Sequence, residues 1–333
     1  MIPEPQKSKT WIKQDNQNKN LLSIPDFCFP FSTSITKETL DGEYMISSGT
    51  YPSQMKCFSL NDLNMKFQRN FDSDIIDFQV LSKNWEKLTF LRSDKKLDFH
   101  TKAGLYYQIK LPEKGCDLTF DRRKLILYIP SVNNKISILD LTQGKFTNEI
   151  KSSENLSITC SGVNPTNGLF ALGSKNGKNE FWDPRILTKC VGKLNCTNYL
   201  KYKKYNSVST LRFSDKNDNL FFSGFRSGEI VVYDLRCFSP LLSKVIQPLN
   251  PIKTIRANYN SNFILVSNSN SVKYWRLSTG KTKFSFKSEI KINHVCSIRD
   301  TGIIFFSLNH KNIGAKYFKS LGPIPEWSEN LFK

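Results

Sequence analysis

Histidine and closely spaced cysteine, the side chains that most metal sites and many catalytic sites use, are scarce in this sequence. Its 333 residues include three histidines, and the eight cysteines contain no Cys-x-x-Cys pair and form no cluster with the histidines. Zinc sites need such ligands at close spacing, so we expect no metal site. No convergent nucleophile, base and acid stands out either, so we expect neither an enzyme nor a cofactor or small-molecule substrate. The thiols should be reduced and mostly buried, as in a cytosolic or nuclear protein.

Long apolar runs are also lacking. No stretch approaches the roughly 18 apolar residues that a membrane span needs. The N-terminal stretch MIPEPQKSKTWIKQDNQNKN contains no apolar segment of the kind found in secretion signals. We therefore expect no membrane partner. The chain is nevertheless 39% hydrophobic and 13% aromatic, which is enough to build a sizeable core.

Negative charge is in short supply. The chain has 48 Lys and Arg against 29 Asp and Glu, a net charge of +19. For a folded protein this excess predicts a polyanionic partner, such as nucleic acid or an acidic protein. The alternative is a mutational bias, because Lys, Asn, Ile and Phe are all frequent while glycine is scarce.

A pattern of two apolar runs separated by a short polar or glycine-containing turn recurs seven times along the chain. The aromatic or aliphatic residues that end the seven copies are 41, 40, 43, 51, 42 and 42 residues apart. This spacing is typical of WD40 repeats, in which each repeat supplies four short strands and the repeats close into a ring. The seven copies are Tyr44–Phe58, Leu88–Phe99, Leu125–Leu139, Leu169–Trp182, Leu220–Tyr233, Phe263–Trp275 and Ile303–Tyr317.

The sequence therefore predicts an all-β protein, a seven-bladed WD40-type β-propeller with degenerate repeats. The Gly-His dipeptide of standard repeats is absent, so cohesion should depend more on apolar packing. Residues 24–30, IPDFCFP, should complete the last blade as its outer strand, since their prolines suit an edge strand. The expected organisation is a basic N-terminal arm (1–20), the propeller (21–319) and a C-terminal tail (320–333) with the motif SLGPIPEW.

The stretch GLFALGSKNGKNEFWDPR contains a sequence similar to a phosphate-binding loop around Lys178. Such a loop needs G-x-x-x-x-G-K-[ST] followed by a helix. Here the glycines are one residue too close, Asn179 replaces Ser or Thr, and a strand follows. The same turn recurs one repeat later as Gly224 to Gly228, so we interpret it as a hairpin in which glycine permits a positive φ. Asp183, Asp234 and Asp140 each end a strand, where a carboxylate can accept hydrogen bonds from the next turn.

The longest repeat interval holds a basic loop, NYLKYKKYNS, at residues 198–207. Lysines that alternate with tyrosines can contact phosphates while the rings stack on bases. The alternative is a solvated loop without a partner. The candidate contacts with RNA or an acidic partner are Lys193, Lys201, Tyr202, Lys203 and Lys204.

Two adjacent repeats end in a W/Y-D-x-R motif, Trp182 to Arg185 and Tyr233 to Arg236. The motif resembles the one through which propeller substrate receptors bind the adaptor of cullin ubiquitin ligases. It implies an alternative function as such a receptor, with Arg185 and Arg236 as the adaptor contacts.

Several stretches resemble one family of WD40 proteins closely, the nucleolar protein ten or essential nuclear protein two family. The most specific is SLGPIPEW at residues 320–327, because it lies outside the repeats. Trp11 in TWIK also resembles the N-terminal tryptophan of the family. The other stretches are DGEYMISSGTYPSQMKCFSLNDLNMKFQRNFDSDIIDFQVLS, LDFHTKAGLYYQIKLP, GLFALGSKNGKNEFWDPR and GEIVVYDLRCFSPLL.

This resemblance implies a non-enzymatic assembly scaffold of the nucleolar small-subunit processome. Such a scaffold supports pre-rRNA processing and maturation of 18S rRNA in ribosome biogenesis. The implied partners are pre-ribosomal particle proteins and pre-rRNA, and the implied location is the nucleus and nucleolus. Family members continue into a long charged C-terminal region, so we expect a chain ending at Lys333 to be a minimal version of the scaffold.

Overall fold

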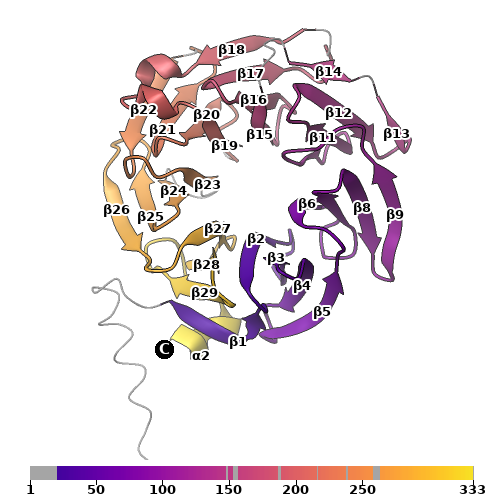
Figure 1. Ribbon diagram of the computed structural model, residues 1–333. Helices are drawn as coiled ribbons and strands as arrows, with labels where there is room; N and C mark the ends of the chain where they lie inside the picture. The colour runs from indigo at the N-terminus through magenta and orange to yellow at the C-terminus, as the bar shows by residue number, and fades with distance from the viewer. Residues whose placement is uncertain are drawn as a thin grey trace, which may run out of the picture.

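Seven antiparallel sheets stand around a central axis and form a closed ring (Figure 1). This computed structural model describes residues 21–147, 149–152, 157–186, 189–215, 217–237, 239–257 and 263–332. The ring confirms the predicted all-β, seven-bladed propeller. The N-terminal arm expected at residues 1–20, including Trp11, lies outside the described residues.

Each blade is a sheet whose strands follow one another outward from the axis. Blade 1 contains β2 (Ser32–Glu38), β3 (Tyr44–Thr50), β4 (Gln54–Ser59) and β5 (Asn64–Asn70). Blade 2 contains β6 (Ile75–Val80), β7 (Leu88–Arg92), β8 (Lys96–Thr101) and β9 (Gly104–Lys110). Blade 3 contains β10 (Thr119–Asp121), β11 (Ile126–Pro130), β12 (Lys135–Asp140) and two short outer pieces, β13 (Lys145–Phe146) and β14 (Ile150–Lys151).

The second half of the ring repeats the same arrangement. Blade 4 contains β15 (Ile158–Val163), β16 (Phe170–Ser174), β17 (Lys178–Trp182) and β18 (Gly192–Asn195). Blade 5 contains β19 (Val208–Phe213), β20 (Leu220–Phe225), β21 (Glu229–Asp234) and β22 (Ser239–Val245). Blade 6 contains β23 (Ile252–Ala257), β24 (Phe263–Asn268), β25 (Ser271–Arg276) and β26 (Thr282–Lys287). Blade 7 contains β27 (Ile292–Ser297), β28 (Ile303–Leu308), β29 (Asn312–Tyr317) and, as its outer strand, β1 (Leu22–Cys28).

Every predicted repeat segment forms the two central strands of a blade. Residues 169–182, for example, include β16 and β17, which pair from Phe170 with Trp182 to Gly173 with Asn179. These strands are buried almost throughout, because each sheet has another sheet on both faces. The repeat prediction is therefore confirmed in register as well as in number.

The ring is closed by the N-terminal strand, as the prolines of residues 24–30 predicted. β1 pairs antiparallel with β29, with Leu22 opposite Ala315. The Phe27 ring is completely buried, stacks on Phe58 of blade 1 at 4.4 Å between centroids, and lies 6.0 Å from Phe305 of blade 7. The first and last parts of the propeller thus share one apolar cluster.

Hydroxyl groups on the innermost strands join neighbouring blades, in addition to the apolar packing expected from the lack of Gly-His. The Thr159 hydroxyl of blade 4 donates to the Val208 carbonyl of blade 5 at 2.7 Å. One repeat later, the Ser209 hydroxyl donates to the Ile252 carbonyl of blade 6 at 2.8 Å. A short side chain at the same place in successive repeats therefore bridges the inner edges of the blades.

The C-terminal segment packs against the ring at the junction of blades 1 and 7. It contains the turn η3 (Glu326–Ser328) and the short helix α2 (Glu329–Phe332). Trp327 and Phe332 pack against the cluster that contains Phe27 and Phe58. The Tyr317 hydroxyl donates to the Gly322 carbonyl at 3.2 Å. The SLGPIPEW motif thus covers the seam where the ring closes.

All eight cysteines are free, as expected from their spacing. Four are buried, three are half-buried, and Cys237 is exposed, so the expectation of mostly buried thiols is met only for Cys57, Cys160, Cys196 and Cys296. Within the described part of the chain, no helix is long and apolar enough to cross a membrane.

Candidate functional site

The basic loop of the longest repeat interval connects β18 of blade 4 to β19 of blade 5. It contains two single 3-10 turns, η1 (Thr197–Tyr199) and η2 (Lys203–Tyr205), beside β18 and β22 (Figure 1). A connection from the fourth strand of one blade to the first strand of the next lies on the same face of the ring as the turns between the second and third strands of each blade. The Cys196 backbone N–H donates to the carbonyl of Gly177, in the β16–β17 turn, at 3.2 Å.

Buried contacts hold this loop on blade 5 and leave its charged side chains outside. Leu200 is buried in the cluster that contains Tyr233. The Lys201 backbone N–H donates to the buried Glu229 carboxylate at 3.0 Å. The Arg226 backbone N–H, in the β20–β21 turn, donates to the Ser207 carbonyl at 2.9 Å. The backbone of the loop is therefore fixed against both neighbouring turns.

The fixed loop brings together exposed cations from three segments. Lys201, Lys203 and Lys204 come from the loop itself, and the two flanking turns add Lys175 and Arg226. We call these five residues the lysine platform. Between them Tyr202 and Tyr205 are 37% and 44% exposed, which leaves part of each ring open to stacking.

Sequence reasoning found three members of the platform and missed two. Lys175 and Arg226 occupy the same position in the hairpin turns of adjacent repeats, so aligning the turns would have identified both. Lys193, also predicted as a contact, is not in these three segments. It lies exposed on β18, opposite Glu180 in the strand register.

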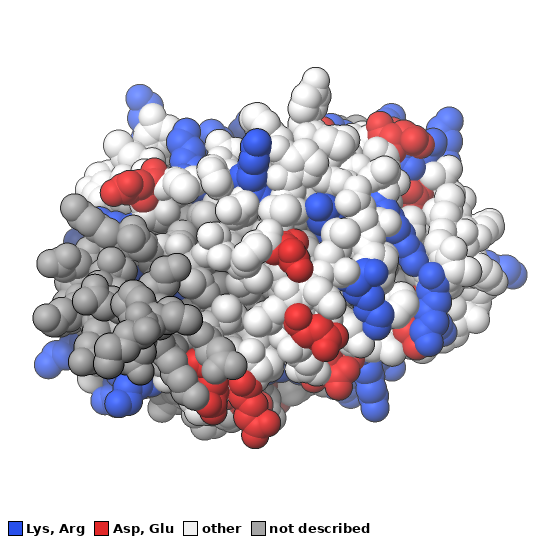
Figure 2. All heavy atoms as spheres, turned by 90° about the horizontal axis from the view of Figure 1, so that it is seen from below, with Lys and Arg blue, Asp and Glu red and all other residues white. Residues whose placement is uncertain are grey.

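The excess of positive charge does not cover the molecule evenly. On the uncovered part of the rim seen from below, basic and acidic side chains are intermixed (Figure 2). The net charge alone therefore does not locate an interface, and the lysine platform is the candidate that the described residues offer. Its lysines and arginine can neutralise phosphates or carboxylates, and its tyrosines can stack on unpaired bases.

The segment that resembles a phosphate-binding loop is a β-hairpin, as interpreted from its recurrence. Gly177 and Gly228 have φ values of +76° and +84°, as a tight turn requires. The preceding glycines have a different role. Gly173 and Gly224 lie inside strands, where a Cβ would come within 2.7 Å of Cys160 Sγ and 2.8 Å of Thr210 Cγ2. Glycine is needed at these two positions because there is no room for a side chain, and not because of the positive φ that we expected for the turn as a whole.

The two W/Y-D-x-R motifs lie at the other end of their strands, and so on the opposite face from the lysine platform. Asp183 accepts the Arg185 backbone N–H at 2.8 Å, and Asp234 accepts that of Arg236 at 3.0 Å. Asp140 accepts the Thr142 N–H at 2.8 Å in the same way, so the predicted role of these aspartates is confirmed.

The two arginines of these motifs differ in their surroundings. Arg236 also folds back onto Asp234, with Nη2 2.8 Å from Oδ2, and this hydrogen bond lowers the pKa of the aspartate. Arg185 is exposed beside a shallow hollow lined by Thr166 and Pro184. Whether these arginines contact an adaptor stays a prediction.

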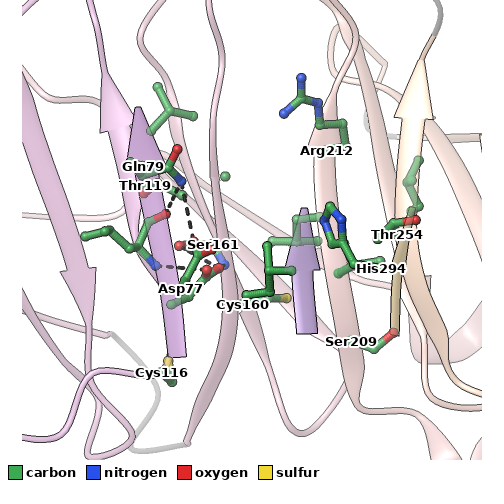
Figure 3. A pocket seen from close by; sticks show the side chains of 18 of the residues that line it. Asp77, Gln79, Cys116, Thr119, Cys160, Ser161, Ser209, Arg212, Thr254 and His294 are labelled. Carbon is green, nitrogen blue, oxygen red and sulfur yellow. Dashed lines mark hydrogen bonds between the residues drawn. The ribbon is translucent and has the colours of Figure 1, made fainter. Parts of the chain in front are cut away.

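The central channel is lined by the innermost strands of all seven blades. Arg212 and His294 lie across it from Asp77, Gln79 and Ser161 (Figure 3). On one side the Lys37 ammonium contacts the Asp77 carboxylate at 2.7 Å. Asp117 lies half-buried beside them and accepts the Ser161 backbone N–H at 2.7 Å. Burial, and to a lesser extent the charge of Asp77, raises the pKa of Asp117 to about 6.

The thiols and the imidazole in the channel are electrostatically unsuited to nucleophilic chemistry. Burial raises the pKa of Cys116 to about 12 and that of Cys160 well above the ordinary value. Both therefore stay protonated at neutral pH, whereas a nucleophilic cysteine needs its thiolate. Burial, with Arg256 and Lys37 adding, lowers the pKa of His294 well below its usual range. Among the described residues, no group of three His, Cys, Asp or Glu is arranged to hold a metal ion.

Comparison with known proteins places the chain among nucleolar proteins. Residues 2–332 match a family model described as "Nucleolar protein 10-like, N-terminal domain". The chain is 33% identical to "Nucleolar protein 10" of Danio rerio, over 92% of this chain and 43% of that protein. It is 31% identical to "Ribosome biogenesis protein enp2 homolog" of Schizosaccharomyces pombe, over 97% of this chain and 53% of that protein. It is also 31% identical to "Ribosome biogenesis protein ENP2" of Saccharomyces cerevisiae, over 98% of this chain and 46% of that protein. The chain spans about half the length of these curated relatives.

Proposed function

Because the chain belongs to the nucleolar protein 10-like family, we propose that it acts in ribosome biogenesis as a non-enzymatic assembly scaffold of the small-subunit processome in the nucleolus. In this role it supports processing of pre-rRNA and maturation of 18S rRNA. The names of its relatives, which include "Nucleolar protein 10" and "Ribosome biogenesis protein ENP2", support the nucleolar location and the ribosomal role.

The observation that supports a scaffold most directly is the lysine platform on a rigid ring. A closed propeller presents its loops without rearrangement, so little conformational entropy is lost when a large partner binds. The platform loop is fixed by the Glu229 and Ser207 hydrogen bonds, and its cations are already on the surface. These properties suit a docking surface on a particle that contains both RNA and protein.

The partner proposed for the platform is single-stranded pre-rRNA. Tyr202 and Tyr205 expose part of their rings between Lys201, Lys203 and Lys204, which matches the alternation of bases and phosphates along a strand. An acidic protein would use the lysines but would gain little from the tyrosines. The protonated thiols and neutral imidazole of the channel support the non-enzymatic part of the proposal.

The test replaces Lys201, Lys203 and Lys204 with alanine and measures binding of a labelled oligouridylate by fluorescence anisotropy at several salt concentrations. Each phosphate contact on a single strand contributes about 0.7 to the slope of log affinity against log salt. Losing three contacts should therefore reduce that slope by about 2 and lower recovery of pre-rRNA with the tagged chain from cells.

A matched control replaces Lys83, Lys87 and Lys124, which are also exposed but lie in the first connections of blades 2 and 3, on the opposite face. It carries the same change in net charge and should leave the slope close to that of the wild type. Equal slopes for the two triple variants would show that the platform does not contact phosphates.

A further inference from the structure

The end of the channel opposite the lysine platform carries a second cluster of cations, which the proposed function does not use. Arg212 lies near the end of β19, Arg256 near the end of β23, and Arg299 just after β27. Arg122, just after β10, completes the cluster. Together they contribute guanidinium groups from blades 3, 5, 6 and 7 to one cavity of about 290 Å³. We call this opening the arginine mouth.

The guanidinium groups of the arginine mouth are incompletely paired. Arg212 Nη2 is 3.3 Å from Asp215 Oδ1, and Arg299 Nε is 3.5 Å from Glu38 Oε1. Strong ion pairs of this kind have distances of about 2.7–2.9 Å. The backbone of Arg256 pairs in the sheet with Leu265, but its side chain makes no hydrogen bond or ion pair with the described residues. A guanidinium has five N–H donors, so most of the donors in this opening are available to a ligand.

The positive charges also repel one another. Burial in the opening lowers the pKa of Arg212, and Arg256 and Arg299 lower it further while Asp215 opposes them. Burial, and then Arg299, lowers the pKa of Arg122. A bound anion would relieve this repulsion, whereas a neutral ligand would not.

A recess with both polar and apolar walls adjoins the arginines. A cavity of about 490 Å³ shares Arg212, Arg256 and Arg299 with the arginine mouth. Its remaining wall includes Leu265, Tyr274, Ile298 and Leu321. Leu321 belongs to the C-terminal segment, so the packing of that segment helps to shape the recess. A ligand that fits both cavities has an anionic group close to an apolar one.

We propose that the arginine mouth binds an extended acidic segment of a partner protein, with carboxylates on Arg212, Arg256 and Arg299 and an apolar side chain in the adjoining recess. This site goes beyond the proposed function of the lysine platform and is independent of it. A peptide suits the opening better than RNA, because Glu38 and Asp215 line both cavities and Asp300 lines the recess. These carboxylates repel a continuous run of phosphates but can accept hydrogen bonds from peptide N–H groups.

The test uses the full chain and a labelled eight-residue peptide in which glutamate alternates with leucine, with binding measured by fluorescence anisotropy. An otherwise identical peptide with glutamine in place of glutamate measures the contribution of charge. The acidic peptide should bind more tightly than the glutamine peptide. Arg256→Gln should weaken its binding about tenfold, as expected for loss of a charge-assisted hydrogen bond.

A second variant guards against loss of binding through misfolding. Asp215→Asn removes a carboxylate that competes for Arg212, so it should tighten binding of the acidic peptide by several-fold. The triple alanine variant at Lys201, Lys203 and Lys204 should bind the peptide like the wild type. Equal affinity for the two peptides, or no change with both Arg256→Gln and Asp215→Asn, would overturn the proposal. Displacement of the peptide by oligouridylate from the wild type but not from Arg256→Gln would show that the opening binds RNA instead.

Discussion

Replacing Phe27 with alanine should destabilise the propeller strongly, because this ring joins the first and last blades. Phe27 is completely buried and stacks on Phe58 at 4.4 Å between centroids. Truncation of a buried phenylalanine costs about 3–5 kcal/mol of unfolding free energy, since it removes apolar contacts and leaves a cavity. The unfolding entropy of a 333-residue chain is about 0.7 kcal/mol/K, at about 2.1 cal/mol/K per residue. The melting temperature should therefore fall by about 4–7 °C.

The assay is thermal unfolding followed by circular dichroism, with Phe31→Ala as the control. Phe31 follows the same strand but is 60% exposed, so its truncation should lower the melting temperature by no more than about 1 °C. If Phe27→Ala shifted the melting temperature as little as Phe31→Ala, the reasoning that the N-terminal strand closes the ring would be refuted.

Three further predictions use the same assay. Gly228→Ala should be severely destabilising, because φ is +84° and a Cβ would lie 1.8 Å from the Gln247 carbonyl oxygen. Gly42→Ala is the control: φ is +73° but the space around it is open, so the loss of unfolding free energy should be only about 1 kcal/mol. Equal losses for the two variants would contradict the packing argument. Burial raises the pKa of Asp117 from 3.8 to about 6, so the stability linked to this group is complete below pH 4 and is lost as the pH rises through 6. Asp117→Asn should therefore gain melting temperature relative to the wild type between pH 4.5 and 7.5, whereas a difference that does not change with pH would count against it. Trp327→Ala should lower the melting temperature by about 3 °C through lost apolar contact at the ring seam. Glu326 is exposed, so Glu326→Ala should leave the melting temperature unchanged. The same result for both variants would show that the C-terminal segment does not stabilise the ring.

The propeller was predictable from the sequence because its signals are local and repeated. Each pair of central strands carries its own apolar pattern, so residues 169–182 identify a hairpin without knowledge of the rest of the chain. The closing strand was predictable for a similar reason, since Pro25 suits only an edge position. The exchange of hydrogen bonds between blades was not predictable in this way. The hydroxyls of Thr159 and Ser209 look like ordinary strand residues until the ring places the next blade beside them.

The candidate site was predictable only in part, because it depends on contacts between separate segments. The lysines at 201, 203 and 204 form a visible run, whereas Lys175 and Arg226 join them only through the turns that flank the loop. The arginine mouth shows the same limit more strongly. Arg212, Arg256 and Arg299 are 44 and 43 residues apart, close to the repeat period, yet only the closed ring brings their guanidinium groups to one opening.

The measurement that tests the proposed role most directly is sedimentation of the tagged chain from cell extract, with the co-purifying RNA identified in each fraction. The scaffold account predicts that the chain migrates with large pre-ribosomal particles and carries precursor ribosomal RNA with it. Migration only as a free monomer, without precursor ribosomal RNA, would contradict it.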